Sequence, residues 1–142
     1  MVAQDYARTY RANAVLTASP GQLVLMMYDG ALRAMAMARE AFGRPPEDLR
    51  RLEVINHQLL KAQQIINQLQ GTLNLDAGDG QFAREMQRLY DYYNRRLMEA
   101  NLRKQVEPVI EVERLLGEVR NAWAEMLRNQ EAAPVAAARG VA

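Results

Sequence analysis

The residue types that most often do chemistry in proteins are scarce in this sequence. There is no cysteine among the 142 residues, and His57 is the single histidine. Without thiols the chain has no cysteine nucleophile, no disulfide scaffold and no cysteine-based zinc site. One histidine is also too few for zinc motifs that use two histidines and for the paired ligands of di-iron helical bundles. We therefore expect neither a metal nor another cofactor.

His57 could still accept a phosphoryl group, as the histidine of a phosphotransfer domain does. Those domains carry His-x-Leu-Lys-Gly, whereas this chain reads His57-Gln58-Leu59-Leu60-Lys61-Ala62. The lysine comes four residues after the histidine instead of three, which moves it around the helix. An alanine also replaces the small glycine beside which a partner would dock. A phosphotransfer module that uses His57 is kept as the alternative function.

The acidic residues do not indicate catalysis either. The loop Asp76–Gly80 has two carboxylates, but it lacks the third ligand position and the closing glutamate of a calcium-binding EF-hand. Elsewhere carboxylates alternate with arginines, as on solvated helix faces. No carboxylate pair lies in an apolar stretch, as acid–base catalysis requires, and no glycine-rich phosphate loop occurs. We expect no enzymatic activity.

Charge and hydropathy exclude further classes of protein. Lys and Arg number 18 against 17 Asp and Glu, a formal charge of +1, and the arginine pairs are interleaved with acids. We therefore expect no nucleic-acid partner. No apolar run approaches the ~18 residues of a membrane span, and no signal-peptide pattern opens the chain. These features predict a cytoplasmic protein with no stable membrane insertion.

The elements that would position any site are helical throughout. Ser19-Pro20-Gly21-Gln22 is typical of a capped helix start, and Gly43 with the following prolines ends this helix near residue 42. Three more helices are predicted at about 47–73, 81–102 and 108–128, each with apolar residues every three or four positions. Because short loops make neighbouring helices antiparallel, the sequence predicts an all-α, up-down four-helix bundle. The expected core stripe of the second helix is Leu52, Ile55, Leu59, Ala62, Ile66, Leu69 and Leu73. That of the third helix is Phe82, Met86, Leu89, Tyr93, Leu97 and Ala100, and that of the fourth is Val109, Val112, Leu116, Val119, Trp123 and Met126.

Two segments flank the predicted bundle domain of residues 19–130. Residues 1–18 carry Tyr6, Tyr10 and Val15 among arginines and an asparagine. We expect this segment to be an extended strip that packs on the bundle and covers apolar surface. Residues 131–142 lack periodicity and are expected to form a disordered tail.

The first two helices carry more apolar surface than the core of a bundle needs. Between residues 23 and 38 only Asp29 and Arg33 are charged, so this helix should be covered on nearly all sides. In the second helix Val54 and Ile65 lie about 120° and 100° from the centre of the apolar stripe, taking about 100° per residue. Surplus apolar surface of this kind usually marks a binding site.

The order of several short motifs resembles a known family. The Thr-Ala-Ser-Pro motif of residues 17–20 is followed by Tyr-Asp-Gly-Ala at residues 28–31, within a stretch from Asn13 to Ala31. This stretch resembles the opening of the bacterial flagellar secretion chaperone family, FliS. Later blocks agree in order and spacing, and the resemblance covers about residues 6 to 128; the blocks are Lys61–Ile66, Leu89–Tyr92, Arg96–Asn101 and Glu111–Trp123.

The resemblance implies a non-enzymatic chaperone built as an antiparallel helical bundle. Members of the family bind the C-terminal segment of newly made flagellin in the cytoplasm, keep it from polymerising early and present it to the flagellar export apparatus. The resemblance also implies that the N-terminal segment packs on the bundle and gives way to the client.

A groove with surplus apolar side chains suits such a client, which would bind as an amphipathic helix. Polar groove residues would fix the register of the client, and apolar ones would supply affinity. A homodimer, in which the first helix completes the core of a partner, is a further interpretation of the same surplus. The predicted groove residues are Asn56, Leu60, Gln63, Ile65 and Asn67 on the second helix, and Leu97, Asn101 and Leu102 on the third, with a core position as the alternative for Leu97.

Overall fold

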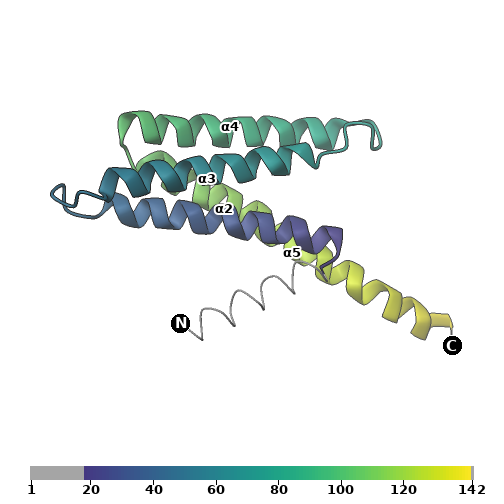
Figure 1. Cartoon of the computed structure of the whole chain (residues 1–142). Helices are drawn as coiled ribbons and strands as arrows, with labels where there is room; N and C mark the ends of the chain where they lie inside the picture. The colour runs from purple at the N-terminus through teal and green to yellow at the C-terminus, as the bar shows by residue number, and fades with distance from the viewer. Residues whose placement is uncertain (1–17, 142) are drawn as a thin grey trace, which may run out of the picture.

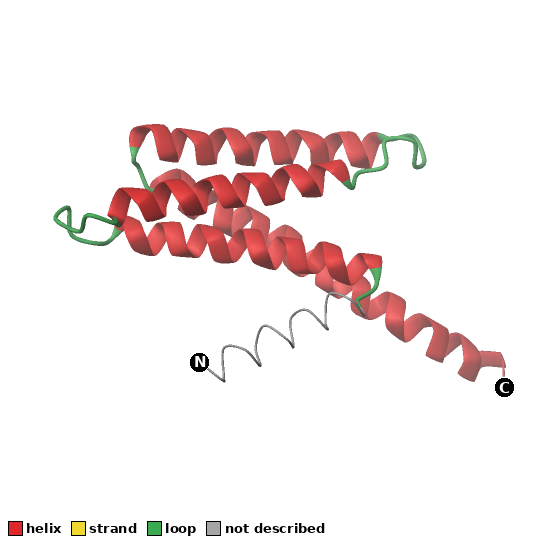
Figure 2. Ribbon diagram, viewed as in Figure 1, coloured by secondary structure: helices red, strands yellow, loops and turns green. Residues whose placement is uncertain are grey.

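The computed structural model describes residues 18–141, with side chains through residue 132. This part of the chain contains no strand and folds into four helices joined by short loops (Figure 2). Consecutive helices run in opposite directions (Figure 1), so the prediction of an all-α, up-down four-helix bundle is confirmed. The helices are α2 (Pro20–Phe42), α3 (Arg51–Gly71), α4 (Gln81–Arg103) and α5 (Glu107–Val141).

The predicted covering strip, with Tyr6, Tyr10 and Val15, falls on residues 1–17 and lies outside the described residues. The division of the chain at residue 18 therefore stays a prediction.

Helix α2 begins as its sequence predicts. The Gln22 backbone N–H donates to Ser19 Oγ at 3.2 Å, and the Ser19 N–H donates to Gln22 Oε1 at 3.1 Å. This reciprocal capping box satisfies donors that a helix start leaves unpaired. Pro20 occupies the first turn, where its missing N–H costs nothing.

Helix α3 begins later than predicted, at Arg51 instead of near residue 47. Asp48 Oδ1 accepts the N–H of Arg50 at 2.9 Å, and the Arg51 N–H bonds to the Asp48 carbonyl at 3.1 Å. An aspartate that bonds to nearby backbone in this way favours a turn over a helix. The acidic residues at 47–48 therefore precede α3 instead of opening it.

The C-terminal end of the chain also differs from the expectation. We expected residues after Gln130 to lack regular structure, whereas α5 continues to Val141. The segment has no apolar stripe. An apolar stripe indicates that a helix packs against other elements, and its absence does not prevent the segment from being helical. It is rich in alanine, which has the highest helix propensity of all residues.

The core contains side chains from all four helices. In α3 the predicted stripe is buried from Ile55 to Leu69, but Leu52 is half exposed. In α4 the predicted stripe is wrong at its start, because Phe82 and Leu89 are 68% and 39% exposed. The alternative series with the same three-and-four spacing is buried; it consists of Ala83, Met86, Tyr90, Tyr93, Leu97 and Ala100.

Helix α5 packs against both α2 and α4, but it crosses α2 obliquely and extends past the other helices (Figure 1). Arg120 Nε donates to Asp29 Oδ1 at 2.7 Å, and Trp123 Nε1 donates to the Gly21 carbonyl at 2.9 Å. A Cβ atom on Gly21 would lie 2.6 Å from Leu127 Cδ2. The absence of a side chain at Gly21 therefore lets α5 approach the start of α2 closely.

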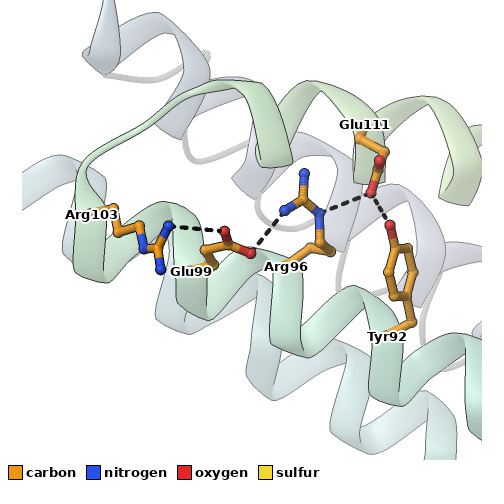
Figure 3. A network of polar contacts seen from close by, with 5 residues as sticks. All are labelled: Tyr92, Arg96, Glu99, Arg103 and Glu111. Carbon is orange, nitrogen blue, oxygen red and sulfur yellow. Dashed lines mark hydrogen bonds and ion pairs between the residues drawn. The ribbon is translucent and has the colours of Figure 1, made fainter.

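A network of polar contacts holds the start of α5 against α4 (Figure 3). Glu111 Oε1 accepts hydrogen bonds from Tyr92 Oη at 2.6 Å and from Arg96 Nε at 3.0 Å. Arg96 Nη1 also donates to Glu99 at 2.8 Å, and Glu99 lies 3.7 Å from Arg103 Nη1. The hydrogen bond from Tyr92, helped by Arg96, lowers the pKa of Glu111 below its ordinary value. The carboxylate is therefore favoured in the folded state.

The substitution Glu111→Gln should destabilise the protein at neutral pH, because it removes the charged acceptor of this network. A carboxyl whose pKa is lowered by folding stabilises the fold above its ordinary pKa and loses that effect as the pH falls through the lowered value. The difference in unfolding free energy between parent and variant should therefore shrink between about pH 5 and pH 3. Urea denaturation followed by circular dichroism measures it.

Glu118→Gln is the matched control on the same helix. Among the described residues Glu118 forms an ion pair with Arg114 alone, at 3.6 Å, and its side chain is 68% exposed. This control should change the unfolding free energy by less than about 0.5 kcal/mol. If Glu111→Gln lowered the unfolding free energy by the same amount at both ends of the pH range, the stabilising role of the Glu111 carboxylate would be contradicted.

Candidate functional site

Three of the predicted groove residues on α3 face α4. Asn94 Nδ2 donates to Asn67 Oδ1 at 2.8 Å, and Gln63 Nε2 donates to the Asn94 carbonyl at 3.3 Å. Further along, Lys104 Nζ donates to Asn56 Oδ1. The structure thus brings these amides together in one line between the two helices.

The same line includes predicted residues from the end of α4. Lys104 Nζ also donates to Asn101 Oδ1. Leu60 lies four residues after Asn56 on the same face of α3 and is 54% exposed, and Leu102 at the end of α4 is 79% exposed. We call this set the α3–α4 surface; it consists of Asn56, Leu60, Gln63, Asn67, Asn101 and Leu102.

The two remaining predicted groove residues lie elsewhere. Leu97 is fully buried in the core, which is the alternative position that the sequence analysis left open for it. Ile65 is half-buried and faces α2, since a Cβ atom on Gly30 would lie 3.5 Å from Ile65 Cδ1. Neither side chain shares the α3–α4 surface.

The residues considered for other chemistry occupy ordinary positions. His57 and Lys61 are exposed on α3, as the periodicity predicts for His57. Asp79 Oδ1 accepts the Gln81 backbone N–H at 3.0 Å, in the turn that leads into α4. Among the described side chains, no three histidine or acidic residues gather closely enough to hold a metal ion. No helix in the described part of the chain is long and apolar enough to span a bilayer.

An apolar cleft that the sequence analysis missed opens between α2, α4 and α5. Its volume is about 560 Å³, within the range of ligand pockets. It lies beside the start of α4, where the oblique course of α5 leads away from that helix (Figure 1). Its main lining residues are Val24, Tyr28, Phe82, Met86, Tyr90, Val119, Trp123 and Met126.

Two tyrosines place a polar pair in the wall of this apolar cleft. The hydroxyl oxygens of Tyr28 and Tyr90 lie 2.5 Å apart, and both side chains are almost completely buried. Burial raises the pKa of both hydroxyls, so both stay protonated at neutral pH. One O–H donates to the other oxygen, which leaves one hydroxyl proton for another acceptor. This hydroxyl proton is thus one of the few polar groups in a mainly apolar lining, which also includes Thr72 and Asn74.

Aromatic side chains form the rim of the apolar cleft. Phe82 is 68% exposed, and Trp123 is half-buried with its ring centroid 6.4 Å from that of Tyr28. Helical periodicity alone predicts core positions for both Phe82 and Trp123. The exposure of Phe82 could have been predicted from Ala83. A second apolar series begins at this small residue, and when that series faces the core, Phe82 lies outside it.

Comparison with known proteins adds an independent finding. The family model described as "Flagellar protein FliS" matches residues 2–130. The chain belongs to the FliS family. It is 35% identical to the flagellar secretion chaperone FliS of Bacillus subtilis over 92% of both chains. It is 38% identical to FliS of Salmonella typhimurium over 85% of this chain and 86% of that protein, and 36% identical to FliS of Escherichia coli over 87% and 88%.

Membership of the FliS family confirms the resemblance seen in the motifs of the sequence. The match includes both the α3–α4 surface and the apolar cleft, since all their residues lie between residues 2 and 130. The matched proteins are named as secretion chaperones, and the phosphotransfer interpretation of His57 finds no support among them.

Substitutions at two leucines of α4 distinguish a predicted site residue that stabilises the core from one that lies on the surface. Leu97→Ala should lower the unfolding free energy by about 2–5 kcal/mol, because it leaves a cavity in the core. Leu102→Ala, on the same helix but 79% exposed, should change it by less than about 0.5 kcal/mol. Urea denaturation measures both, and equal losses would show that Leu97 does not belong to the core.

Proposed function

We propose that this protein is a flagellar secretion chaperone that binds the C-terminal segment of newly made flagellin, prevents premature polymerisation and delivers the client to the flagellar export apparatus. The matched relatives from three bacteria are named flagellar secretion chaperones, which supports the general role. The observation that carries the proposal for this chain is the apolar cleft with the exposed Phe82 at its rim.

The chemistry of the apolar cleft suits one apolar face of a helical segment. An amphipathic helix binds a groove by inserting side chains spaced three and four residues apart. The methionines and aromatic rings that line the cleft adapt readily to such side chains. The free hydroxyl proton of the Tyr28–Tyr90 pair would bond to a carbonyl or amide oxygen of the client.

The area that coupled folding requires is larger than one cleft provides. A segment that folds as it binds typically buries on the order of 1,000–3,000 Å². We therefore propose that the α3–α4 surface is a second contact for the client. Its amides would bond to the client backbone. The exposed side chains of Leu60 and Leu102 would be buried by the client, and this burial would stabilise the complex by about 25 cal/mol for each Å² of apolar surface.

Residues 1–18 would compete with the client for this apolar surface. Tyr6, Tyr10 and Val15 give that segment apolar side chains to place on the bundle. A strip that covers the surface limits self-association, and its displacement lowers the apparent affinity for the client. The proposal needs no enzymatic step and no cofactor.

Phe82→Ser should weaken binding of a flagellin C-terminal peptide by roughly 10- to 100-fold, as expected for an aromatic anchor. The fold should remain intact, because the Phe82 side chain is mostly exposed. Isothermal titration calorimetry measures the affinity, and flagellin lacking its C-terminal segment should not bind.

Leu49→Ser is the matched control, because Leu49 is 97% exposed and lies in the loop at the opposite end of α2. It should leave the affinity unchanged. The cleft would not be the client site if Phe82→Ser bound like the parent, or if both substitutions weakened binding equally.

Removal of residues 1–15 should increase self-association of the protein, because apolar surface then lacks its cover. Binding of the flagellin peptide should become stronger or stay the same. Analytical ultracentrifugation and calorimetry measure the two effects. Markedly weaker peptide binding would mean that this segment is part of the client site, and the competitor proposal would fail.

A further inference from the structure

A second pocket lies at the end of the bundle opposite the apolar cleft. It has a volume of about 530 Å³ and lies between the α2–α3 turn and the α4–α5 turn. The charged residues in its lining are Arg51, Arg96, Glu99, Lys104 and Glu107. We call it the basic pocket.

Two of these charges already have partners. Arg96 and Glu99 bond to each other and belong to the network that joins α4 to α5 (Figure 3). Glu107 is exposed and forms no ion pair with a described residue. Of the three cations in the lining, Arg51 and Lys104 are therefore the two that have no carboxylate partner among the described residues.

Arg51 and Lys104 bond only to neutral groups within the described residues. Arg51 Nη2 donates to the Phe42 carbonyl at 3.2 Å, and its guanidinium carbon lies 6.0 Å from the centre of the Phe42 ring. Lys104 Nζ donates to the side-chain oxygens of Asn56 and Asn101. Among the described side chains, no carboxylate oxygen lies within 4.0 Å of either cation.

Arg51, which lines the basic pocket, has one donor without an acceptor among the described residues. The Nε atom of Arg51 is buried, and it has no hydrogen-bond partner among the described residues. A buried N–H of a cation without an acceptor is unfavourable and rare in folded proteins. Desolvation, with the positive charge of Arg51, lowers the pKa of Lys104. An anion beside the Arg51 guanidinium and the Lys104 ammonium would stabilise both positive charges.

The backbone of Lys104 supports a role for its side chain. Lys104 ends α4 with φ 51° and ψ 51°, and it is the single non-glycine residue with positive φ in the described part of the chain. Glycine, or asparagine, is the favoured residue at such a helix end. Strained positions of this kind cluster at functional sites. A lysine at this position is less favourable in backbone conformational energy than a glycine would be, and its side chain lines the basic pocket.

We infer that the basic pocket is an oxyanion site in which a carboxylate or phosphate group binds between Arg51 and Lys104. The Arg51 guanidinium and the Lys104 ammonium donate to its oxygens. Two sources share this chemistry: a free phosphate ion and the acidic side chain of a bound protein. The site lies at the opposite end of the bundle from the apolar cleft, and Lys104 also bonds to Asn56 and Asn101 of the α3–α4 surface.

Nuclear magnetic resonance on the full ¹⁵N-labelled chain tests the inference. The probes are inorganic phosphate, a short capped glutamate peptide and the matched glutamine peptide, each at constant ionic strength maintained with sodium chloride. We expect the Arg51 Nε–H signal and the Lys104 amide signal to shift saturably with an anionic probe. Lys104→Asn, which keeps a residue suited to positive φ, should weaken that binding by about tenfold.

Lys61→Asn is the control, since Lys61 is exposed on α3 and lies outside the pocket. It should bind the anionic probe like the parent. Saturation by the glutamate peptide and not by the glutamine peptide supports a protein carboxylate as the occupant, and saturation by phosphate alone supports a free ion. Linear shifts with every probe, or equal effects of the two lysine substitutions, would overturn the inference.

Discussion

The candidate site depends on the oblique crossing of α5 over α2. The crossing is close because Gly21 has no side chain to collide with Leu127, and it is fixed by the bonds from Trp123 to Gly21 and from Arg120 to Asp29. Near its start, α5 is tied to α4 through Glu111. Beyond that point α5 crosses α2 and leads away from the start of α4 (Figure 1). The apolar cleft is the space that this divergence opens.

The two ends of the bundle therefore differ in chemistry. At one end, apolar side chains from α2, α4 and α5 surround a cleft whose rim includes the exposed Phe82. At the other end, Arg51 and Lys104 lie in a polar pocket with only neutral partners. A helical client suits the first end, and an oxyanion suits the second. The occupants that we propose for the two ends therefore differ in chemistry as well.

The helices and their faces could be predicted from local patterns, whereas the site depends on how the helices cross. The capping box at Ser19 and the stripe from Ile55 to Leu69 follow from residue types and spacing, and both are confirmed. Periodicity alone could not choose between Phe82 and Ala83 for the core, because both begin an apolar series. It also could not predict the apolar cleft, which arises from a crossing angle between helices distant in sequence. The six residues of the α3–α4 surface were predicted from one helix face at a time, and their role in binding stays a prediction.

Hydrogen–deuterium exchange of the full chain with and without flagellin tests the central claim most directly. The account predicts slower exchange, on addition of full-length flagellin, in the segments that line the apolar cleft, at residues 82–90 of α4 and 119–126 of α5. Flagellin that lacks its C-terminal segment should produce no such protection. Unchanged exchange in both segments when full-length flagellin binds would contradict the account.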